Sequence, residues 1–482
     1  MRGKRAVLAF DLGASSGRAV LGTYLEGKLR YQEVHRFENL PVERGGALCW
    51  DFDTLFSEVQ KGICKAGPVD SLAFDTWGVD FGLLDSEGRM LGPPVHYRDA
   101  RTQGMVEAAL AQIPADCLYA YTGNQIMAIN TLFQLLAVQK KQPELWARAK
   151  TLLFMPDLFA WRLCGEAVCE TSIASTSQML NPDSQVWSLP VLNAFAIPQT
   201  LFARPVKSGT VIGTAVCNGG TAKVIAAAGH DTQCAVAALP TNEGNTAFLS
   251  CGTWSLLGCE LDAPVLTQRS RLLELSNERG ANGRINYLKN IIGLWLIQES
   301  RRQWRRQGRE YSYAELEKQA LDAPPFQSFI DPDAPVFASP GDIPLRVQEF
   351  CRRTRQPVPS SVGEVMRCIY ESLALKYRYA LDQLTAATGI NFKALHVLGG
   401  GAKDKLLCQM AADSCGITVV AGPVEATALG NLIIQLVALR ALPDLAAGRR
   451  MLAQSEALMQ YQPTDKGKWE VAYRTYRNIL KE

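Results

Sequence analysis

The 482-residue sequence has no long hydrophobic run, and its charge is not of one sign. No apolar stretch reaches the roughly 18 residues that a membrane-spanning helix needs. Lys and Arg number 50 and Asp and Glu 47, so the net charge of +3 favours neither nucleic acid nor an anionic membrane. The first apolar run ends at Asp11, too early for the apolar core of a signal peptide. We therefore expect a cytoplasmic protein without a nucleic-acid or membrane partner.

Metal-binding cysteine motifs are also lacking. The chain has 13 cysteines and 4 histidines, but it contains no CxxC pair and the histidines are not clustered near the cysteines. This spacing argues against a zinc site. Most cysteines are expected to be reduced core residues, and a disulfide such as Cys351–Cys368 stays open as the alternative.

The length and an internal similarity predict two domains. A chain of 482 residues is too long for one ordinary hydrophobic core. The segments 7–25 and 245–261 each place a Gly/Ser/Thr turn between two β-rich runs and end in a Leu-Gly pair. We therefore expect related halves, residues 1–242 and 243–482, joined near 239–245.

Other patterns favour an α/β class. A further strand–turn–strand is predicted at 71–85, and the run 394–401 predicts a strand that leads into three glycines and a helix. The clearest helix is 361–388, where apolar residues follow the 3.6-residue period. Ser361 and Glu364 have the spacing of a capping box. The proline-rich stretch 324–344 predicts an irregular connection, and "RRQWRR" a solvated helix face.

Two turns have the composition of phosphate-binding loops. "DLGASSGR" at 11–18 combines glycines, which permit a positive φ, with serine hydroxyls and the charge of Arg18. Asp11 is placed to hold Mg²⁺, which takes one or two carboxylates beside phosphate oxygens. "SCGTWS" at 250–255 is a second such turn. An ordinary hairpin is the alternative for either turn alone, and a packing turn is the alternative for the glycine-rich 398–404.

Asp231 lies between the apolar runs of "VIAAAGHDTQCAVAAL". One interpretation is a helix N-cap, in which the carboxylate accepts free backbone N–H groups. The other is a general base at the end of a strand, where ligands gather in α/β folds. In "DTWGVD" at 75–80, Trp77 can offer an apolar face to a ligand and Asp80 can accept hydrogen bonds from ligand hydroxyl groups. The alternative is a core tryptophan beside a surface aspartate.

Taken in order, eight motifs resemble the FGGY carbohydrate kinases over nearly the whole chain. The motifs are "FDLGASSGRAVLG", "DTWGVDFGLLD" with "YRDART", "MPDLF", "GHDT", "LSCGTWSLLG", "LKNIIGLWLIQES", "LGGGAKDKLLCQMAADSCGI" and "AGPVEATALGN". The resemblance implies an α/β fold of two actin-like, ribonuclease-H-like domains with the active site in the cleft between them.

The resemblance also implies site residues. Asp231 is similar to the family's catalytic base, and Asp11 as a metal residue is a looser inference. The implied contacts to ATP are Ala14, Ser15, Ser16, Gly17, Arg18, Thr253, Gln298 and Gly400. The implied contacts to the sugar are Gly78, His230, Asp231, Thr232 and Asn290. In this assignment residues 1–242 bind sugar and phosphate, and residues 243–482 bind the nucleotide.

The expected activity is an ATP- and Mg²⁺-dependent phosphorylation of a ketose. "DLGASSGR" and "WGVDFGLLD" point to the branch of the family that phosphorylates L-rhamnulose at C1, giving the 1-phosphate and ADP. Another ketose, such as L-fuculose or L-xylulose, is the alternative substrate. A non-catalytic sugar or nucleotide sensor and a chaperone-like ATPase are alternatives of other classes. We expect a monomer or a weak homo-oligomer.

Overall fold

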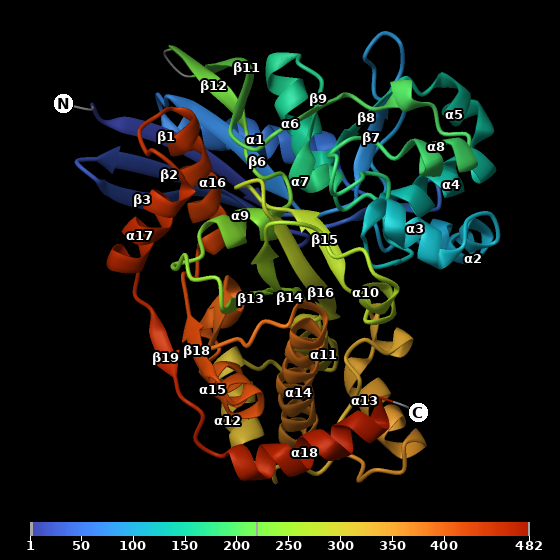
Figure 1. Cartoon of the computed structure of the whole chain (residues 1–482), viewed down its shortest axis with the longest axis vertical. Coiled ribbons are helices and arrows are strands. Elements are labelled where there is room, and N and C mark those ends of the chain that lie inside the picture. The colour runs from blue at the N-terminus through green and yellow to red at the C-terminus, as the bar shows by residue number, and fades with distance from the viewer. Residues whose placement is uncertain (1–2, 218–219, 481–482) are drawn as a thin grey trace. The chain divides into compact units, whose positions relative to one another are not determined.

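A computed structural model describes residues 3–217 and 220–480 of the chain. Its contacts divide the chain into two compact units, whose elements are labelled in Figure 1. The first unit comprises Met1–Asn242, Glu260–Tyr287 and Ala426–Ser455. The second comprises Glu243–Cys259, Leu288–Glu425 and Glu456–Glu482. The first break in the chain therefore falls at the predicted boundary, but two later segments return to the first unit.

A six-stranded sheet forms the centre of the first unit, with the order β11-β12-β6-β1-β2-β3. Its strands are β1 (Arg5–Leu12), β2 (Ser16–Leu25), β3 (Lys28–Glu38), β6 (Ser71–Thr76), β11 (Thr210–Cys217) and β12 (Gly220–Ala226). β1 pairs antiparallel with β2 and parallel with β6, which also pairs parallel with β12. The strand, turn and strand predicted at 7–25 are confirmed.

Three two-stranded sheets and a set of helices complete the first unit. The short pairs are β4 (Val42–Arg44) with β5 (Ala47–Cys49), β7 (Phe81–Leu84) with β8 (Thr151–Phe154), and β9 (Val168–Glu170) with β10 (Arg204–Val206). The helices, with η for a 3-10 helix, are α1 (Phe52–Ala66), η1 (Ala100–Thr102), α2 (Met105–Leu110), α3 (Ala115–Thr122), α4 (Thr131–Lys141), α5 (Pro143–Arg148), α6 (Met155–Cys164), α7 (Thr171–Ala174), α8 (Leu189–Ala194), η2 (Gln199–Leu201), α9 (Asp231–Ala237), α10 (Gln268–Leu272), α16 (Ala426–Ala438) and α17 (Leu445–Ser455).

Helices cover both faces of the six-stranded sheet, so its central strands β1 and β6 are almost wholly buried. On one face, Phe10 of β1 packs in a cluster with residues of α1 and α6. A Cβ at Gly62 of α1 would approach the Phe10 ring to 2.8 Å, which explains the glycine at this close contact. On the other face, Ala73 and Ile225 pack with residues of α9 and α16. Figure 1 shows α16 beside β1, although the two are far apart in sequence.

A second sheet has seven strands in the order β15-β16-β14-β13-β17-β18-β19. The strands are β13 (Thr246–Cys251), β14 (Trp254–Leu261), β15 (Ser276–Arg279), β16 (Ile285–Ile292), β17 (Ala394–Leu398), β18 (Thr418–Ala421) and β19 (Met459–Tyr461). The helices of the second unit are α11 (Trp295–Arg306), α12 (Tyr313–Asp322), η3 (Pro335–Phe337), α13 (Ile343–Arg353), α14 (Val362–Thr388), η4 (Gly400–Lys403), α15 (Lys405–Cys415) and α18 (Lys466–Ile479).

The internal similarity found in the sequence corresponds to a shared strand pattern. β13 pairs antiparallel with β14 and parallel with β17, as β1 does with β2 and β6. In each case the Gly/Ser/Thr turn follows the first strand of the hairpin. The strands predicted at 245–261 are thus confirmed, and the two hairpins share one pattern of strand pairing. That the two halves of the chain are related domains stays a prediction.

The helix predicted at 361–388 is α14, and its ends are as the sequence indicates. Ser361 and Glu364 form a complete capping box, and Gly389 closes the helix with φ 74°. The helix predicted after the three glycines begins only at Lys405, because residues 400–403 form the 3-10 helix η4. The segment 71–85 does form two strands, but β6 and β7 lie in different sheets and are not a hairpin.

All 13 cysteines are free thiols. Cys351 and Cys368 are both buried free thiols, so the structure does not contain the disulfide left open above. Across the described ranges 3–217 and 220–480, no helix is both long and apolar enough to cross a bilayer.

Candidate active site

The turn that carries Asp231 is fixed by hydrogen bonds on both sides. The Thr76 N–H donates to the Gly229 carbonyl at 2.9 Å, and the Gly229 N–H donates to Glu170 Oε2 at 2.9 Å. A Cβ at Gly229 would lie 2.9 Å from Pro156, so the turn has no room for a side chain there. These contacts set the direction in which the first residue of α9 points.

Asp231 is the first residue of α9, and His230 occupies the N-cap position without a capping hydrogen bond of its own. Asp231 Oδ1 accepts from the Thr232 N–H at 2.5 Å and from the Thr232 hydroxyl at 3.3 Å. Oδ2 makes no hydrogen bond or ion pair within residues 3–217 and 220–480. The side chain is 32% exposed. One carboxylate oxygen is therefore anchored and the other is available to a ligand.

His230 lies between Asp231 and a second acid. Its Nε2 is 3.5 Å from Asp231 Oδ1, and its Nδ1 is 3.0 Å from Glu278 Oε2. A Cβ built on Gly78 would lie 3.4 Å from His230 Nε2, so the backbone of Gly78 closes the same space. The structure thus brings together Gly78, His230, Asp231 and Thr232, which the sequence placed in the sugar site.

Burial has the largest influence on the pKa of Asp231 and raises it. The neighbouring His230 acts in the opposite direction and lowers the pKa of this carboxyl. Asp11 raises it further through like-charge repulsion. A carboxyl whose pKa is raised towards neutrality is a better proton acceptor than a freely solvated one.

The first glycine-rich turn joins β1 to β2 and is rigidly held. The Gly13 N–H donates to the Ser16 carbonyl at 2.9 Å, and Asn39 donates through its side chain to Gly13 and through its backbone to Ser15. Arg18 Nε and Nη2 both donate to Asp11 Oδ2, at 2.9 and 2.7 Å. Ala14, Ser15, Ser16, Gly17 and Arg18 therefore form one compact hairpin end with Asp11.

The reason given for the glycines of this turn was wrong. Neither Gly13 nor Gly17 has a positive φ, and neither does Gly252 of the second turn. Gly17 is required because a Cβ there would approach the Phe37 ring to 2.3 Å. The constraint is close packing under the turn rather than an unusual backbone conformation.

Asp75 is a buried carboxyl that the sequence argument missed. The parallel register of β1 and β6 sets it opposite Asp11, and the residue is 0% exposed. Oδ2 accepts from Asn431 of α16 at 2.6 Å, whereas Oδ1 has no hydrogen-bond partner among the described residues. Burial, followed by the charge of Asp11, raises the pKa of Asp75 well above its ordinary value.

Three of the predicted ATP contacts, Thr253, Gln298 and Gly400, lie in the second unit. Thr253, in the turn after β13, donates through Oγ1 to Gln298 Oε1 of α11 at 3.3 Å. A Cβ at Gly401 would meet the Cys251 sulfur at 2.2 Å, so the turn that begins at Gly400 lies against the end of β13. Asn290 lies on β16 of the same sheet. Thr253, Gln298 and Gly400 thus come together.

Asp80 cannot serve as the acceptor for ligand hydroxyl groups that the sequence suggested, because it is fully buried and both of its oxygens are occupied. Oδ2 accepts from the indoles of Trp50 and Trp77 at 2.7 and 2.9 Å and from the Tyr97 N–H at 3.1 Å. Oδ1 accepts from Gln134 at 3.0 Å. Trp77 is 5% exposed and packs on Trp50. This cluster is a core network.

Two arginines of the basic run at 301–306 form ion pairs within their own helix. Arg302 and Arg306 of α11 both pair with Glu299, which is almost completely buried, at 3.0 and 2.5 Å. Arg301 donates to the Tyr311 carbonyl at 2.5 Å. Arg302, Arg305 and Arg306 are exposed whereas Trp304 is buried, so the predicted exposed helix face is confirmed.

The donor set fits Mg²⁺ held mainly by water and phosphate. No cluster of three or more His, Cys, Asp or Glu side chains suited to a metal occurs in residues 3–217 and 220–480. Mg²⁺ needs only one or two protein carboxylates beside phosphate oxygens and waters. Asp11, at the edge of the first turn, can supply one of them.

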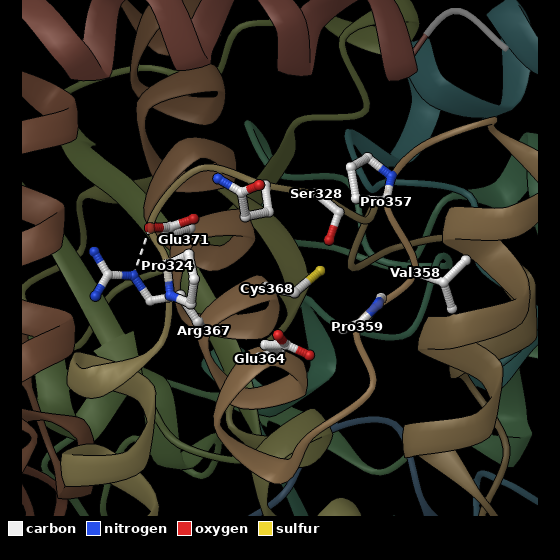
Figure 2. A pocket seen from close by; sticks show the side chains of 10 residues that line it. Pro324, Ser328, Pro357, Val358, Pro359, Glu364, Arg367, Cys368 and Glu371 are labelled. Atoms are coloured by element: carbon white, nitrogen blue, oxygen red, sulfur yellow. Dashed lines mark hydrogen bonds and ion pairs between the residues drawn. The ribbon is translucent and has the colours of Figure 1, made fainter.

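A surface pocket of about 130 Å³ in the second unit is distinct from these residues (Figure 2). It is lined by Pro324, Gln327, Ser328, Pro357, Val358, Pro359, Glu364, Arg367, Cys368 and Glu371. Figure 2 shows the ion pair of Arg367 with Glu371 on one side and the sulfur of Cys368 at the centre. None of the predicted site residues lines this pocket.

Comparisons with known proteins identify the family of the chain. The chain matches the models of the N-terminal domain of the FGGY family of carbohydrate kinases over residues 6–238 and of its C-terminal domain over residues 247–439. The chain belongs to the FGGY family of carbohydrate kinases and has its two-domain α/β fold.

Similar curated proteins within that family include rhamnulokinases. The chain is 41% identical to a rhamnulokinase of Bacteroides thetaiotaomicron, covering 99% of this chain and 100% of the relative. It is 40% identical to a rhamnulokinase of Klebsiella pneumoniae, covering 95% of both chains. The crystal structure of a ligand-bound xylulose kinase of Lactobacillus acidophilus is similar with a TM-score of 0.81, at 17% identity over 99% of this chain and 98% of that one. At that identity the likeness shows the fold alone.

Proposed function

We propose that this carbohydrate kinase transfers the γ-phosphoryl group of ATP to the C1 hydroxyl of L-rhamnulose. The O–P bond between the β- and γ-phosphates breaks, a bond forms between O1 of the ketose and the γ-phosphorus, and ADP leaves. The hydroxyl proton passes to Asp231. The products are L-rhamnulose 1-phosphate, ADP and a proton that Asp231 returns to water.

The carboxylate of Asp231 is the observation that carries the proposed chemistry. A sugar hydroxyl is a weak nucleophile until a positioned base accepts its proton during attack. Asp231 Oδ1 is held by the Thr232 N–H, and Oδ2 is open to a ligand. The turn before Asp231 is fixed because Gly229 hydrogen-bonds to both Thr76 and Glu170. A sensor would need no such base, so the geometry favours an enzyme over the sensor and the chaperone-like ATPase.

Sugar contacts are proposed for the groups around that oxygen. The Gly78 backbone, His230 and Thr232 share the space beside Asp231. Asn290 is assigned to the sugar through the family resemblance. The rhamnulokinase names of relatives at 40–41% identity favour L-rhamnulose over L-fuculose or L-xylulose.

The ATP phosphates are assigned to the two hairpin turns. Residues 14–18 form the first, with the Arg18 guanidinium neutralising phosphate charge, and Thr253 lies in the second. Gln298 and Gly400 are assigned to the rest of the nucleotide. Mg²⁺, held in part by Asp11, would supply charge neutralisation on the phosphates. Most of the rate acceleration in phosphoryl transfer comes from such positioning and electrostatics.

The decisive experiment is an ADP-release assay over a panel of ketoses with the wild type and Asp231→Asn. We expect L-rhamnulose to give the highest kcat/KM and the variant to lose about 10²–10⁴-fold in kcat. Nucleotide affinity, measured by calorimetry, should stay within about twofold, because Asp231 is not assigned to ATP.

Asp262→Asn is the matched control, since the Asp262 side chain is 91% exposed and should leave turnover unchanged. Near-normal turnover of Asp231→Asn would show that the base is assigned wrongly. ADP release that does not depend on any sugar would favour the ATPase alternative.

A further inference from the structure

His230 is clamped between two carboxylates inside the first unit. Glu278 on β15 contacts its Nδ1 at 3.0 Å, and Asp231 on α9 lies 3.5 Å from its Nε2. His230 is 8% and Glu278 4% exposed, so water screens this contact weakly. The two ring nitrogens therefore face opposite acids, one of which is the proposed base.

The hydrogen bonds around Glu278 fix the position of one imidazole proton. Gln233 Nε2 donates to Glu278 Oε2 at 2.6 Å, and Gln233 Oε1 at the other end accepts from Asn286 Nδ2. The amide is thereby held with its nitrogen towards the carboxylate. A lone pair on His230 Nδ1 would be repelled by Glu278 at 3.0 Å, so Nδ1 carries a hydrogen and donates it to Oε2.

The charges that face His230 from the surrounding elements are negative. They are Glu278 of β15, Asp231 of α9 and Glu170, which is the last residue of β9. Arg279, next to Glu278, turns away and donates to the Gly283 and Pro182 carbonyls. Burial by itself lowers the pKa of His230, but the charge and hydrogen bond of Glu278, then Asp231 and Glu170, outweigh it and raise the pKa.

We propose that Glu278 is a positioning residue for phosphoryl transfer: it orients the His230 ring and keeps it as an imidazolium whose Nε2–H faces Asp231. This inference rests on the proposed function, because it assigns Glu278 a role through the base. The imidazolium offsets part of the cost of burying the Asp231 charge and so favours the ionised form of Asp231, which is the form that accepts the hydroxyl proton.

The pH dependence of kcat/KM tests the proposal with Glu278→Gln. Without the carboxylate, His230 loses its proton at a lower pH and Asp231 loses a neighbouring positive charge, so the pKa of Asp231 rises. The acid limb of the profile should move to higher pH by about one unit, so that kcat/KM falls by a factor approaching ten at pH values below the wild-type limb. At high pH, where Asp231 is ionised in both proteins, the difference should shrink.

Two variants separate this effect from simple loss of structure. Glu278→Asp keeps the charge and should keep the wild-type acid limb even if its overall rate falls. Glu87→Gln changes an acid that is 65% exposed and should leave the whole profile unchanged. A uniform fall in rate for Glu278→Gln, without movement of the acid limb, would overturn the proposal.

A direct titration makes the test independent of turnover. The four histidines give few imidazole NMR signals, and His230→Gln assigns the one of interest. In the wild type this signal should titrate with a midpoint above pH 6.5. The midpoint should be lower in Glu278→Gln and close to the wild-type value in Glu278→Asp. A wild-type His230 that titrates below pH 6.5 would overturn the proposal. If no ketose supports turnover, the proposed function fails, and this titration still decides the charge of His230.

Discussion

Glu170 is a single carboxylate that accepts five hydrogen bonds at the base of the turn that carries Asp231. Oε2 accepts from the N–H groups of Ser172, Ile173 and Gly229 and from the Ser172 hydroxyl, at 2.5 to 3.1 Å. Oε1 accepts from the Ser208 hydroxyl at 2.6 Å. Glu170 is 1% exposed, and the donors Ser172, Ile173 and Gly229 are also buried, so these three residues have no ready access to water instead.

We predict that Glu170→Ala lowers the free energy of unfolding by about 3–5 kcal/mol, because it leaves three buried N–H groups without an acceptor. Turnover should fall as well, since Gly229 loses one of the bonds that orient Asp231. Glu170→Gln should be far milder, because its amide group can face Ser208, whose hydroxyl can rotate to accept. Urea unfolding of both variants checks this, and equal losses for Ala and Gln would contradict it.

His396 is a buried histidine whose Nδ1 has no hydrogen-bond partner within residues 3–217 and 220–480. It lies on β17, and burial lowers its pKa to about 4. In the unfolded chain His396 therefore takes up a proton below about pH 6.5, whereas in the folded chain it does so only below about pH 4. The free energy of unfolding is unaffected by this histidine above pH 6.5, and it decreases as the pH falls from 6.5 towards 4, because protons then bind to His396 preferentially in the unfolded chain.

His396→Leu removes the pH dependence of stability that this histidine causes. Between pH 7 and pH 4 the wild type should lose about 2–3 kcal/mol more stability than the variant. Thermal or urea unfolding at the two pH values measures the difference, and each protein serves as its own reference at pH 7. Parallel losses in the two proteins would show that His396 is protonated without cost in the folded state.

At this scale the sequence could supply Asp231 and its neighbours, but not their partners. His230, Asp231 and Thr232 are consecutive, so a local motif reveals them together. Glu278 lies 48 positions from His230 and Glu170 lies 59 from Gly229, and no local pattern connects them. Buried acids are rare enough that Glu278, in "SNERG", is expected at the surface without tertiary information.

At the scale of elements, α9 is positioned by its packing on α16. A Cβ added to Gly430 of α16 would lie 1.8 Å from the Cys234 carbonyl oxygen of α9. Gln435 and Asn431 of the same helix bond each other and reach the sheet, Gln435 to Ser71 and the Leu8 carbonyl and Asn431 to Asp75. α16 thus fixes both the helix that bears Asp231 and the strands beneath it.

Gly430→Ala should therefore push α9 and α16 apart. We expect a loss of about 2 kcal/mol or more in stability, as for other overpacked cores, together with reduced sugar-dependent turnover. Gly467→Ala is the matched control, because Gly467 lies in helix α18, has no atom within 4 Å of an added Cβ and should be neutral or slightly stabilised. Calorimetry of both variants provides the measurement, and equal melting temperatures would contradict the expectation.

Helices that end in local signals were predictable, and helix partners were not. The capping box at Ser361 and Gly389 marks both ends of α14 in the sequence itself. The apolar periodicity of α16 says only that it is buried, and does not indicate that it packs on strands more than 350 residues earlier. The same limitation applies to β7, whose partner β8 follows it in the chain only after one 3-10 helix and four α-helices.

At the scale of the whole molecule, the two units are built from interleaved parts of the chain. The first unit requires Ala426–Ser455, and the second unit resumes at Glu456. A cut after Asn242 thus removes α16 from the sheet and leaves Asp75, Ser71 and the Leu8 carbonyl without their partners. The location of the active site between the two domains stays a prediction.

We predict that a fragment of residues 1–242 does not fold cooperatively. It should bind the dye ANS, show no sharp thermal transition and be cut rapidly by protease, because the face of its sheet that packs on α16 is exposed. Joining residues 426–455 to it through a flexible linker should restore a transition, whereas joining residues 288–317 should not. A well-folded 1–242 fragment would contradict the interleaved arrangement.

The return of α16 to the first unit also sets a timetable for biosynthesis. A ribosome that has released residue 242 must still add about 210 residues before Ser455 emerges, which takes about 10–40 s at about 5–20 residues per second. During that interval the nascent chain carries a sheet with one apolar face uncovered. Chaperones that bind nascent chains should therefore hold this polypeptide longer than a protein whose N-terminal domain is contiguous.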